Sequence, residues 1–162
     1  MGVNTAERFE EATEWSCLAE EVGAAGSETI LLVEDEVFVR EVTCEVLQAA
    51  GYRVLLAKNA VEAMDVYEQC GGEVELLLTD VVLRGETGRA LAESLRRKNP
   101  VLKVLLVTGY AEQMGLREGN QEECLAKPYA TEVLLRRVRQ RLDGIELGSE
   151  TEELIRQSCD NG

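Results

Sequence analysis

Five short apolar runs, separated by stretches of helical periodicity, restrict the fold of this chain more than any other feature of its sequence. The runs are TILLV at 29–33, YRVLLA at 52–57, VELLLT at 74–79, VLKVLLV at 101–107 and ECLA at 123–126. Three of them consist almost entirely of Val, Leu and Ile, which is typical of strands buried on both faces of a parallel sheet. The intervening segments are then expected to be the helices that connect these strands.

The expected helices span residues 39–50, 59–69, 88–98, 111–117 and 131–142. Gly51 ends the first, because glycine is the commonest residue just after a helix. Asn59 followed by Glu62 forms a capping pair for the second, and Thr131 is the expected N-cap of the fifth. Five βα units predict an α/β, doubly wound fold with right-handed crossovers, a parallel sheet and helices on both faces.

Charge divides the 162 residues into one domain and two acidic flanks. Residues 1–27 carry six acidic residues and one basic residue, and residues 144–162 carry five and one, so the middle holds only −5 of the net charge of −14. Residues 5–22 have near-helical apolar spacing before a Gly-rich linker, which fits a packed helix and a frayed segment equally well. We expect a domain at 28–143, an extension at 1–27 and a tail at 144–162.

The composition excludes several classes of function. An excess of 31 Asp and Glu over 17 Lys and Arg disfavours binding to nucleic acid or to an anionic membrane. The absence of histidine excludes Ser-His-Asp and Cys-His catalysis and His-ligated zinc. The five cysteines are at least 26 residues apart, so none forms a CxxC pair. No signal peptide and no run of about 20 apolar residues is present, so we expect a cytoplasmic protein without membrane insertion.

Polar residues follow four of the apolar runs, at ends that share one edge of a parallel sheet. They are Glu34, Asp35 and Glu36 after the first run, Asp80 after the third, Thr108 after the fourth and Lys127 after the fifth. Clustered carboxylates repel, so such a site either raises a carboxyl pKa or holds a hard divalent cation, for which Mg²⁺ fits oxygen ligands best. One carboxylate can then attack a phosphoryl group and form an aspartyl phosphate.

Four strings carry a resemblance to a known family: ILLVEDE (30–36), LLLTDVVLRGETG (76–88), VLLVTGY (104–110) and LAKPY (125–129). In this order and spacing they resemble the receiver domain of two-component response regulators, most closely the receivers at the C-terminal end of hybrid sensor kinases. The resemblance covers about 28–143. It implies a flavodoxin-like (βα)5 fold with strand order 2-1-3-4-5, and a kinase phosphohistidine as the phosphoryl donor.

The resemblance also implies a role for each matching residue. Asp80 corresponds to the phosphorylated residue, and Thr108 and Lys127 correspond to the groups that act on the phosphoryl group with it. The implied ligands of the Mg²⁺ cofactor are Glu34, Asp35, Asp80 and the backbone carbonyl of Val82. The Lys127-Pro128 bond is cis in the family.

This chain departs from the family at two positions. Arg84 stands where proline is usual. Cys124 occupies the strand position where many receivers carry an aromatic residue that moves together with the threonine, here Thr108. The sequence leaves open whether Tyr110 or Tyr129 takes over that switching role.

We therefore expect a phosphorelay receiver rather than an enzyme, with a sensor histidine kinase or a histidine phosphotransfer protein as donor and a downstream protein as output partner. Only 19 residues follow residue 143, so no DNA-binding output domain is expected, and a homodimer is left open. One alternative is a receiver-like interaction module that is never phosphorylated. A weaker one is an aspartyl-phosphate phosphatase of the haloacid-dehalogenase kind, which needs an Asp where this chain has Val82.

Overall fold

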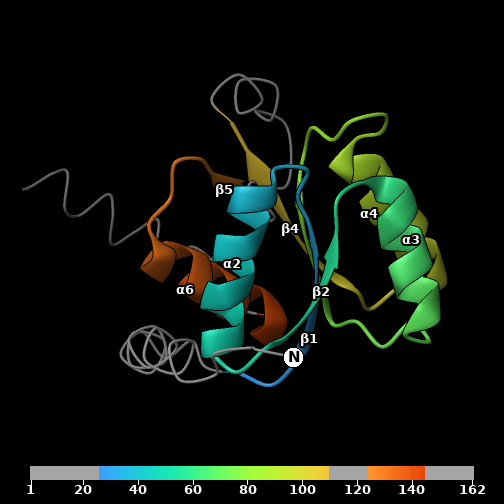
Figure 1. Ribbon diagram of the computed structural model, residues 1–162. Coiled ribbons are helices and arrows are strands. Elements are labelled where there is room, and N and C mark those ends of the chain that lie inside the picture. Colours follow the sequence, from blue (N-terminus) through green and yellow to red (C-terminus); the bar gives the residue numbers. More distant parts are fainter. Residues whose placement is uncertain (1–25, 110–123, 145–162) are drawn as a thin grey trace, which may run out of the picture.

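The computed structural model describes residues 26–109 and 124–144, which form a five-stranded sheet covered by helices on both faces (Figure 1). In chain order the elements are β1 (Thr29–Val33), α2 (Val37–Ala49), β2 (Arg53–Ala57), α3 (Ala60–Gln69), β3 (Leu76–Asp80), α4 (Gly88–Lys98), β4 (Lys103–Thr108), β5 (Cys124–Ala126) and α6 (Thr131–Asp143). Neighbouring strands are all parallel, in the order β2-β1-β3-β4-β5. This confirms the predicted doubly wound fold and its strand order.

Alternate residues of the central strands supply two separate core layers. In β1, Ile30 and Leu32 pack with α2 and α6, whereas Leu31 and Val33 pack with α3 and α4. Figure 1 shows these two helix pairs on opposite sides of the sheet. Every residue of β1 and β3 is buried, because side chains on successive residues point to opposite faces and both faces are covered.

Most helix ends agree with the sequence pattern. The Asn59 side chain accepts a hydrogen bond of 2.8 Å from the Glu62 amide, as the capping pair predicts. The prediction that Thr131 caps α6 is wrong. Ala130 has the extended backbone of an N-cap, Thr131 is already the first helical residue, and no side chain caps this helix.

Two of the apolar runs begin two residues earlier than the strands that they contain. β3 starts at Leu76 and β4 at Lys103, and each continues one residue further than expected. Asp80 and Thr108 are therefore the last residues of their strands rather than the first residues of the following loops. The predicted helices at 5–22 and 111–117, and the tail after residue 144, lie outside the described residues.

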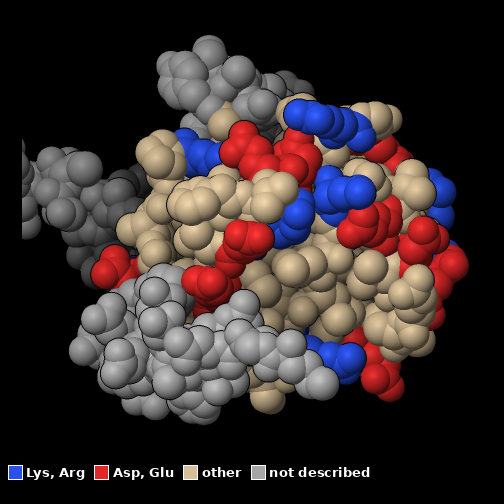
Figure 2. Space-filling view, in the orientation of Figure 1, with Lys and Arg blue, Asp and Glu red and all other residues tan. Residues whose placement is uncertain are grey.

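Acidic and basic side chains are interspersed over the face of the molecule seen in Figure 2. Within residues 26–109 and 124–144, no helix is long and apolar enough to cross a bilayer.

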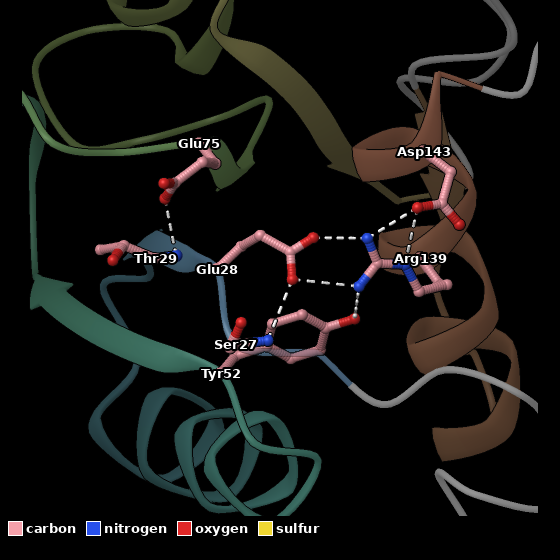
Figure 3. Close-up of polar contacts among 7 residues, drawn as sticks. All are labelled: Ser27, Glu28, Thr29, Tyr52, Glu75, Arg139 and Asp143. Carbon is pink, nitrogen blue, oxygen red and sulfur yellow. Dashed lines mark hydrogen bonds and ion pairs between the residues drawn. The ribbon is translucent and has the colours of Figure 1, made fainter.

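A cluster of polar residues fixes the segment that leads into β1 (Figure 3). The Glu28 carboxylate pairs with the guanidinium group of Arg139 on α6, which also contacts the Asp143 carboxylate and the Tyr52 hydroxyl. The Gly26 amide donates a hydrogen bond of 3.0 Å to the Ala50 carbonyl at the end of α2. We call Glu28, Tyr52, Arg139 and Asp143 the Glu28 cluster. It lies where β1 begins, at the opposite edge of the sheet from the strand ends that carry the candidate site.

Candidate functional site

Three carboxylates meet at the carboxyl ends of β1 and β3. Glu34, Asp35 and Asp80 each place one oxygen atom within 4.8 Å of the other two. The two strands are neighbours, with Val33 paired to Thr79, so the residues at and just beyond their ends are brought together. Glu34 and Asp80 are buried, whereas Asp35 is partly exposed. The structure thus brings together the three acidic side chains that were predicted as metal ligands.

Lys127 completes the charge arrangement. Its Nζ lies 2.9 Å from Oδ1 of Asp80 and 3.7 Å from Oε2 of Glu34. Burial lowers the pKa of Lys127, but the hydrogen bond to Asp80 and the charges of both carboxylates outweigh it and raise that pKa overall. The side chain is therefore an ammonium group that faces Asp80 and Glu34 at neutral pH.

The environment of Glu34 favours the protonated form of its side chain. Burial, and then the hydrogen bond and charge of Asp80, raise the pKa of Glu34 to about 8, against the opposing effects of the Glu36 amide and Lys127. A raised carboxyl pKa is one of the two outcomes expected of clustered carboxylates.

Backbone contacts hold these side chains in place. The Glu36 amide donates to Oε1 of Glu34 over 3.1 Å, and the Arg40 guanidinium group donates to the Glu34 carbonyl over 2.7 Å. On the other side, the Lys127 amide donates to the Thr108 carbonyl over 2.8 Å, and the Lys127-Pro128 bond is cis as expected. Both charged loops are thus anchored to neighbouring strands or helices.

Thr108 ends β4 one register position beyond Val107, the residue that pairs with Asp80. It is 1% exposed, and its hydroxyl oxygen has no hydrogen-bond partner within the described part of the chain. A buried hydroxyl without a partner is costly in a folded protein. Thr108 therefore has an unused hydroxyl donor at the same end of the sheet as the carboxylates.

The remaining predicted residues are placed less directly. Val82 is 60% exposed and forms an isolated bridge with Thr87, and its carbonyl as a metal ligand stays a prediction. Cys124 packs against the core layer of α3 and α4, whereas Tyr129 packs against the layer of α2 and α6. Tyr129 therefore lies on the wrong face to replace an aromatic residue at position 124. Tyr110 lies outside the described residues.

Two residues near the site have contacts that the sequence did not predict. A Cβ atom at Gly88 would lie 2.0 Å from the Asp80 carbonyl oxygen, so only glycine lets α4 begin against this strand end. The sequence showed only a glycine at the first position of the expected third helix. Arg84 Nε lies 3.6 Å from the Asp35 carboxylate, but with 91% of its side chain exposed the pair contributes little.

The donor set fits a hard divalent cation. All three side chains offer oxygen atoms within 4.8 Å of each other, the ligand type that Mg²⁺ prefers. A cation would also favour the charged form of Glu34, which burial and then Asp80 disfavour. Glu34, Asp35 and Asp80 are therefore the residues that would hold it.

Comparison with known proteins gives one consistent match. The family model of the response regulator receiver domain matches residues 30–139 of this chain. A sensor kinase, CckA from Brucella abortus, is 38% identical over 122 residues, which cover 74% of this chain and 13% of the kinase. The transcriptional regulatory protein AruR from Pseudomonas aeruginosa is 34% identical over 131 residues, which cover 79% of this chain and 49% of AruR. The chain spans less than half the length of either relative.

Solved structures agree in fold. The receiver domain of the hybrid histidine kinase CckA has a TM-score of 0.59 at 34% identity, over 70% of this chain and 98% of that domain. A response regulator receiver domain protein from Clostridium thermocellum has a TM-score of 0.66 at 19% identity, over 74% of this chain and 98% of that protein, and so shows the fold alone.

Proposed function

The chain belongs to the response regulator receiver domain family, and from this premise we propose that Asp80 accepts a phosphoryl group from a phosphohistidine of a sensor histidine kinase or a histidine phosphotransfer protein. The observation that carries the proposal is the position of Lys127 Nζ, 2.9 Å from Oδ1 of Asp80, beside the carboxylates of Glu34 and Asp35. This arrangement sets a nucleophile next to a fixed positive charge.

In the proposed reaction, one oxygen of Asp80 attacks phosphorus. The bond between phosphorus and the donor imidazole nitrogen breaks, and the nitrogen keeps the electron pair. The Lys127 ammonium group binds phosphoryl oxygens, and the buried hydroxyl of Thr108 donates the hydrogen bond for which it otherwise has no described acceptor. When bound by the three carboxylates and the Val82 carbonyl, Mg²⁺ would supply further positive charge to those oxygens.

The proposed output is a change of conformation. Thr108 is the last residue of β4. Its carbonyl oxygen accepts a hydrogen bond from the amide of Lys127, which follows β5. A phosphoryl group that draws in Thr108 and Lys127 together would shift the relative stability of two arrangements of β4, β5 and α6. We propose that a protein partner recognises this change, and that the chain is a signalling receiver rather than an enzyme acting on other substrates.

The test is phosphoryl uptake from a small donor. We expect the wild-type protein with Mg²⁺ and labelled acetyl phosphate to gain one label that hydroxylamine removes, and Asp80→Asn to gain none. Glu36→Gln is the matched control, because Glu36 is an exposed acid at the same loop whose side chain is outside the carboxylate cluster.

Equal labelling of Asp80→Asn would disprove Asp80 as the acceptor. No labelling of the wild-type protein by acetyl phosphate or by any histidine kinase tested would instead favour an interaction module that works without phosphorylation.

A further inference from the structure

Tyr129 lies beneath the candidate site, two residues after the lysine that contacts Asp80. Its phenol ring packs against the core layer of α2 and α6, and it lines a small pocket of about 10 Å³ together with Glu34, Thr43, Thr79 and Asp80. The Tyr129 side chain therefore lines the same pocket as the side chains of Glu34 and Asp80.

The phenol is held by a second hydroxyl. Thr43 on α2 is only 7% exposed and lines the same small pocket as Tyr129, where its hydroxyl lowers the pKa of the Tyr129 phenol through a hydrogen bond. Burial raises the pKa of Tyr129 more than this hydrogen bond lowers it, so the phenol stays protonated at neutral pH. A paired, buried hydroxyl keeps a fixed orientation, since its alternative is an unsatisfied polar atom.

Three residues of α2 and its N-cap contact the residues of the candidate site. Glu36 at its N-cap binds the Glu34 carboxylate through its amide, Arg40 binds the Glu34 carbonyl, and Thr43 binds Tyr129. These positions are four and then three residues apart, so they share one stripe of the helix. The same helix stripe thus contacts the loop that carries the carboxylates and the turn that carries Lys127.

We propose that Tyr129 is a positioning residue, which, through its bond to Thr43, holds the 127–129 turn so that the Lys127 ammonium group stays on Asp80. The proposal rests on the proposed function, because its main consequence is the rate at which Asp80 accepts a phosphoryl group. In this role Tyr129 acts on the position of Lys127 and not on the phosphoryl group itself. The position of Tyr129 fixes the backbone at Pro128 and Lys127, and through it the place of Lys127 Nζ.

The experiment compares the full chain with Tyr129→Phe, Thr43→Val and the double variant, using phosphoramidate as donor and intact mass as readout. We expect each single variant to be phosphorylated about 3- to 10-fold more slowly at saturating Mg²⁺, as expected for the loss of one hydrogen bond. The Mg²⁺ concentration for half-maximal rate should stay unchanged, because the carboxylates are not altered. The double variant should be no slower than either single variant, since both remove the same bond.

Two controls separate positioning from general damage. Thr43→Ser keeps the hydroxyl and should restore the rate to within about twofold of wild type. Tyr67→Phe removes a hydroxyl from a buried tyrosine on the opposite core layer and should leave the rate unchanged. Unchanged rates in both Thr43→Val and Tyr129→Phe, or a double variant whose slowing equals the product of the single effects, would overturn the proposal.

A second readout works without phosphorylation. Hydrogen exchange of the Tyr129 and Ala130 amides should be faster in Thr43→Val than in wild type or Thr43→Ser, and equal exchange in all three would contradict a positioning role. If the wild-type protein takes up no phosphoryl group but this difference is present, the proposed function fails while the positioning of the turn stands.

Discussion

At the scale of single residues, Glu34 is the carboxyl group whose protonation a bound cation would change most. It is 5% exposed, and burial together with Asp80 raises its pKa to about 8. In the unfolded chain the same group titrates near 4.5. Between these values the folded protein holds a proton that the unfolded chain has lost, so without a metal the protein loses stability as pH rises from 4.5 to 8. A cation that needs the carboxylate must displace this proton.

Mg²⁺ binding should therefore release a proton and depend on pH. We expect the apparent affinity to rise by up to about tenfold per pH unit between pH 6 and 8, because one proton competes with the metal. Titration calorimetry in two buffers of different ionisation enthalpy measures the proton released.

Glu34→Gln should bind Mg²⁺ more weakly and without this pH dependence, whereas Glu36→Gln should keep both the affinity and the slope. A wild-type affinity that is flat from pH 6 to 8 would contradict the assignment of Glu34 as the titrating ligand.

At the scale of elements, the end of α2 is held by a close approach of two chain segments. Gly51 follows this helix with φ of +100°, and a Cβ atom there would lie 2.3 Å from the Gly26 carbonyl oxygen. Gly71, after α3, also has a positive φ of +71°, but no atom lies within 4 Å of the same position. Both glycines therefore have a positive φ, but only at Gly51 would an added Cβ atom collide with a neighbouring segment.

Gly51→Ala should consequently destabilise the protein more than Gly71→Ala. We expect about 1 kcal/mol for Gly71→Ala from the left-handed backbone, and about 2 kcal/mol or more for Gly51→Ala because the segment at Gly26 must also move. Urea unfolding of both variants gives the two free energies. Equal losses would mean that the contact between Gly26 and Gly51 contributes nothing to stability.

The central strands and the site edge could be predicted because their signals are local. A continuous apolar run such as Leu76–Leu78 needs cover on both faces, and a polar residue at its end, such as Asp80, then falls at a known edge of the sheet. The cap of α6 was missed because Thr131 has the side chain of an N-cap but follows Ala130, whose backbone takes that position.

Contacts between distant segments left no sequence signal. The face on which Tyr129 packs depends on the path of the turn after Lys127, and the pairing of Tyr129 with Thr43 joins residues from the two ends of the fold. Gly88 is needed only because Asp80 lies against it in space. Such requirements follow from tertiary packing and cannot be read from spacing along the chain.

At the scale of the whole molecule, the Glu28 cluster joins the segment before β1 to α6, the last helix of the described residues. Glu28 and Arg139 are 111 residues apart, and their side chains are 26% and 19% exposed. The hydrogen bonds from Arg139, opposed in part by burial, lower the pKa of Glu28 to about 2. Because the folded pKa lies below the ordinary value of 4.5, this pair stabilises the protein fully above pH 4.5 and loses its effect as pH falls toward 2.

Glu28→Gln should therefore lower the free energy of unfolding by about 1 to 2 kcal/mol at pH 7, with the difference from wild type shrinking as pH falls from 4.5 toward 2. Urea unfolding across this pH range measures the effect. Glu68→Gln, which removes the more exposed pair with Lys98, should change stability by less than about 0.5 kcal/mol at any pH. A loss in Glu28→Gln that does not vary with pH would show that the ion pair is not its source.

The same cluster holds both ends of the described fold within reach of one guanidinium group, since Arg139 contacts both Glu28 before β1 and Asp143 at the end of α6 (Figure 3). Boundaries so close together suit circular permutation and insertion into a loop of a host protein. A short peptide could join residues 28 and 143, with new termini opened in the turn at Gly71 and Gly72, where the backbone leaves α3. Because this seam and the Asp80 edge lie at opposite ends of the strands, the permuted unit would still present Asp80 to a donor.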